Sequence, residues 1–300
     1  MSNKLIFEVK DINHDIDIKD YLRERENLSG RFVRKALREG RIFVNGEKVI
    51  RKRKLEKANL IEIYMSQEEH QNIQPESMDI EIIYEDSDII VINKTPGIVV
   101  HPTKSYPTGT LSNGILYHFH TTGDRSIVRL VNRLDRDTSG LIIVAKNQFA
   151  HMRLAEDMTK ASFKKIYVAV VHGTLKEKEG IINLPIYREE GTGSIKRVVD
   201  DRGQESITRY KVLQESSKGS IVKLQLETGR THQIRVHMSH LGHPLYADSL
   251  YGNRDEEKEY IERQALHAYR LEFPHPRTRE ILKLQCDLPQ DIKELIEKIK

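Results

Sequence analysis

Short apolar runs are the feature that most limits what this chain can fold into. The longest unbroken run, Ile166–Val171, has six residues, whereas a helix needs about 20 apolar residues to cross a bilayer. From residue 79 onward, runs rich in β-branched residues alternate with short polar turns. These runs cover residues 79–84, 89–94, 141–145, 164–171, 208–214, 220–227, 265–273 and 280–286. The pattern predicts a mainly antiparallel sheet and no membrane span.

Helical patterns interrupt these strands and place the chain in the α+β class. They cover residues 111–119, 147–158, 231–241 and 289–299. The polar segment 66–78 contains Pro75 and lacks periodicity, so we expect a linker there. We therefore predict a small N-terminal α/β domain in residues 1–65 and a larger domain in residues 79–300, built on a mainly antiparallel mixed sheet with flanking helices. The Gly-rich, charged segment 188–205 is expected to be a long mobile loop.

Composition and missing motifs exclude several classes of protein. The first 13 residues hold only three consecutive apolar residues, so no secretory signal is expected and the chain is assigned to the cytoplasm. The single cysteine, Cys286, can form neither an internal disulfide nor a multi-thiolate metal site, and it fits a buried position in a reducing compartment. There is no Walker-type loop, dinucleotide fingerprint or zinc-peptidase motif. We therefore expect no membrane association and no nucleotide cofactor.

The N-terminal 65 residues carry the excess positive charge of the chain. They hold 16 Lys+Arg against 11 Asp+Glu, although the formal net charge of all 300 residues is only +4. Residues 29–40 read as a helix with Ser29 as its N-cap. Its basic residues lie together on one face, opposite the apolar ones: Arg31, Arg34, Lys35 and Arg38. This one-sided cationic face predicts binding to the phosphates of a nucleic acid.

A hairpin and an earlier helix complete the N-terminal pattern. Asn45-Gly46, a strong signal for a tight hairpin turn, stands between two strand-like segments. The earlier helix is indicated by an apolar stripe at Ile18, Tyr21 and Leu22. Two short helices followed by a basic hairpin resemble the S-four-type RNA-binding domain, which is named for a ribosomal protein. Asn59 replaces the acidic residue often found before the last strand of that domain.

The most distinctive segment is VNRLDRDTSGLIIVAKN, residues 131–147. It resembles the signature H-R-L-D-x-x-T-S-G, which precedes a central strand in the RluA-type pseudouridine synthases. Three further family blocks stand in the expected order: KTPGIVVHPT in 94–103, KKIYVAVVHG in 164–173 and LETGRTHQIRVHMSHLGHPLYAD in 226–248. The resemblance covers roughly residues 79–285. It implies isomerisation of uridine in RNA by a site that needs no cofactor.

The resemblance assigns roles to four residues. Asp135 matches the catalytic carboxylate, which acts either as a nucleophile or as the base that takes a ribose proton. Arg230 matches the arginine that pairs with this carboxylate, and Tyr167 matches the tyrosine whose ring stacks on the target base. Arg133 matches the residue that fills the space left by the flipped nucleotide. Asp137 is the rival carboxylate, but it occupies a variable position of the signature.

One position departs from the signature, and one group of histidines suggests another kind of site. Asn132 stands where the family usually has His; it cannot titrate near neutral pH, so no acid–base role is expected there. Supporting roles are expected for His101, His232, Gln233 and Arg235. His237, His240 and His243 recur every three residues, which rotates them around a helix instead of directing them at one metal ion. We therefore expect no metal site.

The combined prediction is a cytoplasmic RNA pseudouridine synthase with a basic N-terminal RNA-binding domain. Its partner is structured RNA, with ribosomal RNA, mainly of the large subunit, favoured over transfer RNA, and a monomer is favoured. Two alternatives stay open: a catalytically silent RNA-binding or ribosome-assembly factor with the same fold, and a metal-dependent RNA hydrolase using the histidines. The sequence leaves the modified positions and the exact chemical role of Asp135 undecided.

Overall fold

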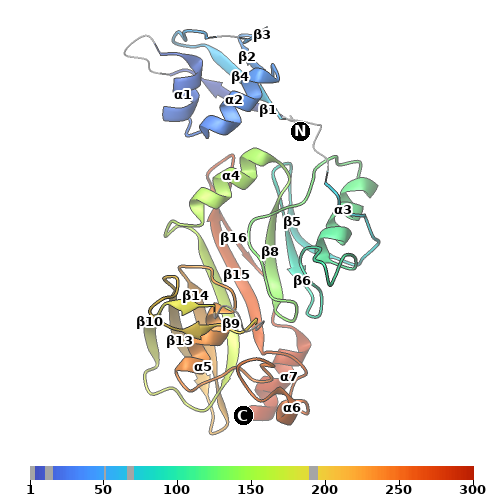
Figure 1. Cartoon of the computed structure of the whole chain (residues 1–300), viewed down its shortest axis with the longest axis vertical. Coiled ribbons are helices and arrows are strands. Elements are labelled where there is room, and N and C mark those ends of the chain that lie inside the picture. Colours follow the sequence, from blue (N-terminus) through green and yellow to red (C-terminus); the bar gives the residue numbers. More distant parts are fainter. Residues whose placement is uncertain (1–3, 11–15, 51, 66–70, 189–194) are drawn as a thin grey trace.

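A sheet of ten strands runs through the larger part of the molecule (Figure 1). The computed structural model describes residues 4–10, 16–50, 52–65, 71–188 and 195–300. The main path of the sheet runs β10-β13-β14-β9-β15-β8-β6-β5, while β7 pairs with β8 and β16 with β15. The strands are β5 (Glu81–Glu85), β6 (Ile89–Lys94), β7 (Arg129–Leu130), β8 (Ser139–Ala145), β9 (Lys164–His172), β10 (Glu179–Asn183), β13 (Ile207–Glu215), β14 (Gly219–Leu226), β15 (Leu266–Pro274) and β16 (Ile281–Gln285).

Helices flank this sheet at several places along the chain (Figure 1). They are α3 (Leu111–Thr121), α4 (Gln148–Asp157), α5 (Gln233–His240), α6 (Arg254–Glu257) and α7 (Gln290–Ile299). The four helices and the strands expected from the sequence are present, so the predicted α+β class is confirmed. The short helix α6 and strand β10 lacked a clear pattern and were not predicted. Within the described ranges, no helix combines the length and the apolar character needed to cross a membrane.

Among the described residues, every pairing in the large sheet is antiparallel except one. Strands β8 and β15 run parallel, with His267 opposite Ser139 and Ala268 opposite Gly140. Both strands lie in the middle of the sheet, and all seven residues of β8 are buried. Burial on both faces explains why the sequence LIIVA is continuously apolar. The predicted mainly antiparallel mixed sheet is confirmed.

Strand β8 divides the core of the large sheet into two layers. Ile142 and Val144 belong to an apolar cluster on one face, which helix α3 also enters. Leu141, Ile143 and Ala145 belong to a second cluster, which includes residues of α4. Because successive side chains of a strand point to opposite faces, one apolar run serves both layers. The strand is thereby fixed, and with it the DTSG turn that precedes it.

The N-terminal residues form a separate four-stranded sheet of order β1-β4-β2-β3. Its elements are β1 (Lys4–Glu8), α1 (Ile18–Glu24), α2 (Gly30–Arg38), β2 (Ile42–Val44), β3 (Glu47–Lys48) and β4 (Leu60–Tyr64). The Ser29 hydroxyl caps α2 by accepting from the Phe32 amide at 3.2 Å, as predicted. Asn45 and Gly46 have φ values of 51° and 81°, which a tight hairpin turn requires. The predicted basic helix and hairpin are therefore present.

The N-terminal sheet is anchored to the rest of the chain by direct contacts. Phe149 and Met152 of α4 pack into its apolar core. The Arg153 guanidinium donates to the Glu26 carbonyl, and Arg277 donates to the Lys4 carbonyl at 2.8 Å. These contacts join α4 and the β15–β16 turn to the N-terminal unit, which Figure 1 places next to α4.

The predicted linker, residues 66–78, is only partly described, and the described part is packed. Residues 66–70 lie outside the described ranges. The Gln71 side chain accepts from the Val128 amide at 2.9 Å and donates to the Val128 carbonyl at 3.0 Å. Ile73 is buried in the core, and the Asn113 side chain of α3 donates to the Gln74 carbonyl at 2.7 Å. The described part of this segment therefore packs against the larger domain. Its polar sequence gave no indication of these contacts.

The prediction of a long mobile loop in residues 188–205 is partly wrong. Residues 189–194 lie outside the described ranges. From residue 195 the chain is ordered: strand β12 (Val198–Val199) pairs with β11 (Ile186–Tyr187), and Gln204 bridges to Ile186. The Tyr251 hydroxyl accepts from the Arg197 amide at 2.8 Å. A long-range hydrogen bond to Tyr251 could not be read from a Gly-rich sequence.

We predict that Gly140→Ala destabilises the protein far more than a glycine change outside the sheet. Gly140 has φ of 110°, and a Cβ there would stand 2.3 Å from the Ala268 carbonyl oxygen. Strain plus this backbone clash should cost about 3 kcal/mol or more in the free energy of unfolding. Gly123→Ala is the control, because its φ is 73° but a Cβ would meet nothing within 4 Å. Urea unfolding of both variants checks this; equal losses would contradict it.

Candidate active site

A pocket of about 710 Å³ brings the four sequence blocks together. Its walls include residues from the segments 99–103, 131–138 and 226–235, and from strand β9. Asp135, Tyr167, Arg230 and Arg133, the four residues that the sequence selected, all line it. The volume is in the range of pockets that enclose small ligands. The predicted site residues thus meet in one place, although they do not all make the predicted contacts.

Asp135 lies in a tight turn before β8. The Thr138 amide donates to the Asp135 carbonyl at 3.1 Å, which closes the turn. The Asn132 side chain accepts from the Ile143 amide at 2.7 Å and donates to the Leu141 carbonyl at 3.4 Å. Both polar groups of this buried asparagine are therefore used to hold the turn on the β8 backbone. This structural use agrees with the expectation that Asn132 takes no part in acid–base chemistry.

Two buried cations hold the same turn from outside. The Lys94 ammonium donates to the Arg136 carbonyl at 2.8 Å and to two carbonyls of the loop after β6. Burial and the nearby Arg263 charge lower the pKa of Lys94 to about 7. The Arg263 guanidinium donates to the Asp137 carbonyl at 3.0 Å. The backbone around Asp135 is thus fixed by side chains far away in the sequence.

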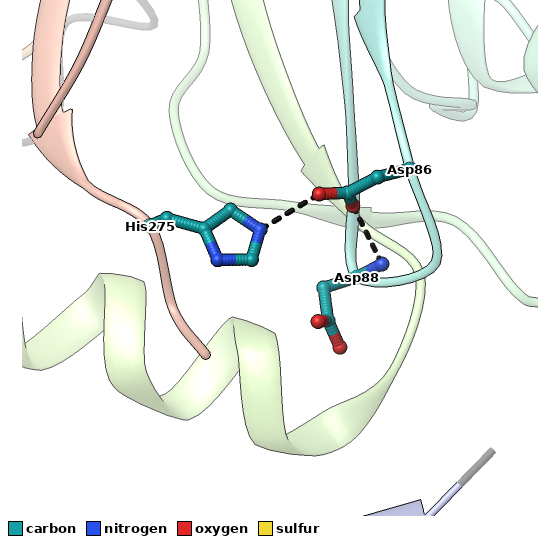
Figure 2. Close-up of side chains that lie close together, drawn as sticks. All are labelled: Asp86, Asp88 and His275. Atoms are coloured by element: carbon teal, nitrogen blue, oxygen red, sulfur yellow. Dashed lines mark hydrogen bonds and ion pairs between the residues drawn. The ribbon is translucent and has the colours of Figure 1, made fainter. Parts of the chain in front are cut away.

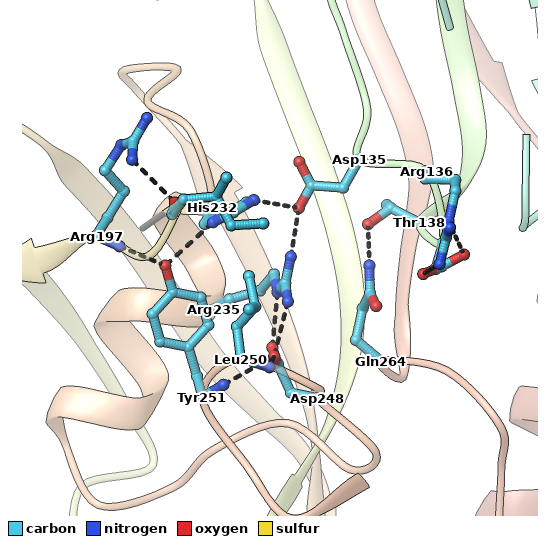
Figure 3. Close-up of polar contacts among 12 residues, drawn as sticks. Asp135, Arg136, Thr138, Arg197, His232, Arg235, Asp248, Leu250, Tyr251 and Gln264 are labelled. Atoms are coloured by element: carbon cyan, nitrogen blue, oxygen red, sulfur yellow. Dashed lines mark hydrogen bonds and ion pairs between the residues drawn. The ribbon is translucent and has the colours of Figure 1, made fainter. Parts of the chain in front are cut away.

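The Asp135 carboxylate is oriented by Arg235 (Figure 3). The Arg235 guanidinium donates to Asp135 Oδ2 at 2.9 Å and to both oxygens of Asp248 at 2.7 Å each. Asp248 is fully buried, whereas the Asp135 side chain remains 29% exposed. Burial lowers the pKa of Arg235, but hydrogen bonds and charges of the two aspartates outweigh it and raise that pKa overall. Asp135 Oδ1 has no hydrogen bond within the described residues, so it stays available to a ligand.

The predicted pairing of Arg230 with Asp135 is wrong in this structure. Arg230 precedes helix α5, is exposed, and its Nε donates to the Glu205 carbonyl at 3.1 Å. Arg235, which the sequence suggested only as a supporting residue, makes the ion pair instead. Both arginines stand in the same block, five residues apart, and the block alone does not tell which one reaches the carboxylate.

The start of α5 explains why the two arginines diverge. His232, just before the helix, has φ of 58°, a left-handed conformation that turns the chain. The Gln233 side chain accepts from the Arg230 amide at 2.9 Å and donates to the Ile207 carbonyl at 3.0 Å, which fixes the turn. Arg235 then falls on the buried side of the first helical turn, where Asp248 holds it. The Nε2 atom of His232 lies 3.8 Å from Asp135 Oδ2. Burial lowers the pKa of the His232 imidazole.

Tyr167 forms part of the pocket wall from strand β9. Its side chain is buried, and it also belongs to the apolar core beneath the pocket. Burial and the negative charge of Asp135 raise the pKa of the Tyr167 hydroxyl above its ordinary value. The phenol therefore stays protonated at neutral pH and can donate a hydrogen bond, while its ring offers an apolar face.

Two further charged residues differ in their orientation. Arg133 is exposed, lines the pocket and makes no hydrogen bond or ion pair with any described residue, so its guanidinium is available to a ligand. The rival carboxylate Asp137 does not line the pocket. Its two oxygens accept from Arg136 at 3.0 and 3.1 Å. Geometry therefore favours Asp135 over Asp137 as the reactive carboxylate.

The histidines do not converge on a common point. Both ring nitrogens of His237 are used, at 2.9 Å from the Thr208 hydroxyl and 3.0 Å from the Leu184 carbonyl. His243 is engaged with the His172 carbonyl at 2.8 Å. These contacts leave no ring nitrogen of His237 for a metal, so the hydrolase alternative loses its ligand set.

Asp86, Asp88 and His275 are the one group of three possible metal ligands found among the described residues (Figure 2). Their polar atoms are used within the protein. His275 Nδ1 accepts from two backbone amides, so Nε2 carries the proton and donates to Asp86 at 2.7 Å. Asp88 accepts both arms of the Arg277 guanidinium, at 2.6 and 2.7 Å. We interpret the cluster as the support of Arg277, which in turn contacts the Lys4 carbonyl of the N-terminal sheet.

Comparisons with known proteins identify relatives of this chain. Residues 88–240 match the family model described as RNA pseudouridylate synthase. The chain is 43% identical to the uncharacterized RNA pseudouridine synthase YjbO of Bacillus subtilis (strain 168), covering 86% of this chain and 90% of that one. It is 36% identical to ribosomal large subunit pseudouridine synthase D of Pasteurella multocida (strain Pm70), covering 86% and 83%. Among solved structures, human RNA pseudouridylate synthase domain containing 1 aligns with a TM-score of 0.58 at 26% identity, covering 76% and 97%.

We predict that Arg235→Met destabilises the protein much more than Arg230→Met. Removing Arg235 leaves the buried Asp248 without its ionic partner, which should cost about 3–5 kcal/mol. Arg230 is exposed and donates to one carbonyl, so its loss should change the free energy of unfolding by about 0.5 kcal/mol or less. Chemical unfolding of the two variants measures both values. An Arg230 variant as unstable as the Arg235 variant would contradict the observed division of roles.

Proposed function

Because this chain belongs to the RNA pseudouridylate synthase family, which isomerises uridine in RNA, we propose that Asp135 is the carboxylate that carries the reaction. The observation that supports this proposal is the ion pair of Asp135 with the buried Arg235 at the wall of the pocket. The pair orients the carboxylate beside a fixed positive charge, and its Oδ1 has no hydrogen bond to a described residue. No other carboxylate lines the pocket among the described residues.

The chemistry of the isomerisation explains why a carboxylate without a cofactor suffices. The bond from ribose C1′ to uracil N1 breaks, the base turns, and C1′ bonds to C5. The proton on C5 is lost and N1 gains one, so nothing is oxidised and no atom is added overall. Asp135 can serve either by attacking C1′ or by taking a proton from the ribose. Both routes require a carboxylate oxygen held in a fixed position, which the ion pair with Arg235 provides.

Tyr167 and Arg133 are proposed to hold the base and the surrounding RNA. The buried Tyr167 ring supplies a flat apolar wall against which the uracil can lie. Arg133 at the pocket wall has no partner in the described chain and can enter the space that the flipped uridine leaves. Flipping costs a few kcal/mol, and least where the base is already unpaired.

We further propose that the substrate is ribosomal RNA of the large subunit. Supporting this are relatives named ribosomal large subunit pseudouridine synthase D, at 36% and 38% identity. Transfer RNA remains the competing substrate in the test below. The uridine itself would be chosen by the RNA structure that fits the pocket and the surfaces around it.

Residues 1–65 are proposed to act as an RNA-binding domain through helix α2. Arg31, Arg34 and Arg38 are exposed, and Lys35 is partly exposed beside them. None of the three arginines forms an ion pair with a described residue. Phosphates can therefore bind them without first breaking a contact within the protein. Because the unit is anchored to α4, its basic face has a defined position relative to the catalytic sheet.

We predict that Asp135→Asn abolishes pseudouridine formation while Asp137→Asn preserves it. The amide keeps the size of the side chain but can neither attack C1′ nor accept a ribose proton. Asp137 is the matched control, because it stands in the same turn and its carboxylate faces Arg136 instead of the pocket. Ribosomal RNA, ribosomal precursor particles and transfer RNA would be incubated with each protein. Mass-resolved nucleoside analysis after pseudouridine-specific labelling then measures and maps the product.

Two results of this experiment would contradict the proposal. Product at the wild-type rate from Asp135→Asn would remove the carboxylate from the mechanism. Tight binding of RNA by the wild type, without any product on the three RNA classes, would favour the catalytically silent RNA-binding or assembly factor.

We also predict that replacing Arg31, Arg34 and Arg38 with Gln lowers RNA affinity and its dependence on salt. Each lost phosphate contact should reduce the slope of log K against log [salt] by about 0.7–0.9, or about 2–3 for the triple variant. A matched control removes three exposed lysines elsewhere: Lys176, Lys258 and Lys293. Filter binding or anisotropy across a salt series measures the slopes. Equal effects of the two triple variants would contradict a specific role for α2.

A further inference from the structure

Lys165 is a buried cation in the pocket that has no partner in the described chain. It is 4% exposed and lines the pocket from strand β9. It stands two residues before Tyr167, so the two side chains lie on the same face of the strand. The preceding Lys164 faces the other side and pairs with Glu272 at 3.2 Å. Adjacent lysines of one strand thus have opposite environments.

The other buried lysines among the described residues, Lys94 and Lys146, both have partners for their ammonium groups. Lys94 donates to three backbone carbonyls. Lys146 pairs with Glu85 at 2.8 Å and with Asp124 at 2.7 Å. An ammonium group removed from water without such partners is unfavourable by several kcal/mol. Burial, together with the charge of Arg230, accordingly lowers the pKa of Lys165.

Arg230 supplies a second positive charge to the same part of the pocket. Both side chains line the pocket, and each is electrostatically unfavourable to the other. The Lys165 ammonium lies close to Gly229, where an added Cβ would be 3.5 Å from Nζ. Asp135, the one carboxylate that lines the pocket in the described part of the chain, is already paired with Arg235. Two cations that share a wall without a counter-ion form a ready site for an anion.

We propose that Lys165 and Arg230 form a subsite for a phosphate flanking the target uridine. This inference rests on the proposed function of the pocket, because phosphate is the anionic group that an RNA substrate brings. Lys165 acts as a buried point charge, and Arg230 adds a planar guanidinium at the exposed rim. Phosphate binding there places the ribose between Asp135 and the Tyr167 ring. Arg230 thereby gains a role in binding, in place of the pairing with Asp135 that Arg235 makes.

The first experiment compares ligands that differ only in the phosphate. Uridine, uridine 3′-monophosphate and uridine 5′-monophosphate are titrated into the wild type, Lys165→Met and Lys164→Met, with binding measured by NMR or calorimetry. In the wild type and in Lys164→Met, one monophosphate should bind about tenfold or more tightly than uridine. In Lys165→Met this advantage should fall to within about twofold. Equal binding of all three ligands by the wild type would overturn the subsite.

Stability distinguishes a binding role from a structural one. Lys165→Met removes a buried charge that has no partner, so it should raise the thermal midpoint of unfolding. A lysine that stabilised the fold would give a lower midpoint. Loss of stability together with an unchanged preference for the monophosphate would therefore refute the proposal, even if activity fell.

Activity on RNA separates this inference from the proposed function. An RNA carrying the mapped uridine is prepared with a neutral methylphosphonate at its 5′ or 3′ phosphate. At one of the two positions the wild type should lose efficiency, whereas Lys165→Met should be insensitive to that change. If the wild type forms pseudouridine but the effects of Lys165→Met and the methylphosphonate are fully additive at both positions, the subsite is wrong while the enzyme stands. If the wild type forms none, the proposed function fails, and the nucleotide titration still decides on the subsite.

Discussion

The ion pairs of Arg235 with Asp248 and Asp135 are the interaction on which the pocket depends. Asp248 is buried, holds Arg235 by two hydrogen bonds and also accepts from the Leu250 and Tyr251 amides. Asp135 receives a single bond and keeps partial exposure. The same cation thus has one fully buried partner, Asp248, and one partner that is accessible from the pocket, Asp135. The two buried hydrogen bonds to Asp248 fix Arg235. A substrate could therefore replace the single, accessible bond between Arg235 and Asp135 without loosening the fold.

The rest of the fold serves to bring Asp135 to this arginine. The DTSG turn enters β8 at its parallel pairing with β15, where Gly140 allows the β15 backbone to approach closely. Lys94 and Arg263 bind the carbonyls of the turn, so the backbone cannot relax away from α5. Such use of buried charges stabilises little by itself, since desolvation offsets most of the attraction. It does define one position for a carboxylate, which a catalytic site requires.

Structural features that depend on neighbouring residues could be predicted from the sequence, whereas contacts between distant residues could not. Unbroken apolar runs rich in β-branched residues predicted β8 and β9, and Ser29 and Asn45-Gly46 predicted a cap and a turn that are present. The sequence did not show whether Arg230 or Arg235 pairs with Asp135. The pairing depends on the left-handed conformation of His232 and on Asp248, thirteen residues after Arg235. Lys165 was hidden for a similar reason: its sequence reads as a strand residue, and only the structure reveals the missing partner.

The anchored N-terminal unit changes how its basic helix would contribute to binding. A flexibly linked domain raises affinity through effective concentration alone, and it accepts many relative orientations of the RNA. Here Phe149 and Met152 enter the N-terminal core, and Arg277 reaches the Lys4 carbonyl. If α2 binds phosphates as proposed, a fixed cationic face would select RNA whose phosphates match both α2 and the pocket at once. Charge that carries no base-specific information would then contribute to the choice of substrate through geometry, because an RNA of the wrong shape would reach only one of the two surfaces.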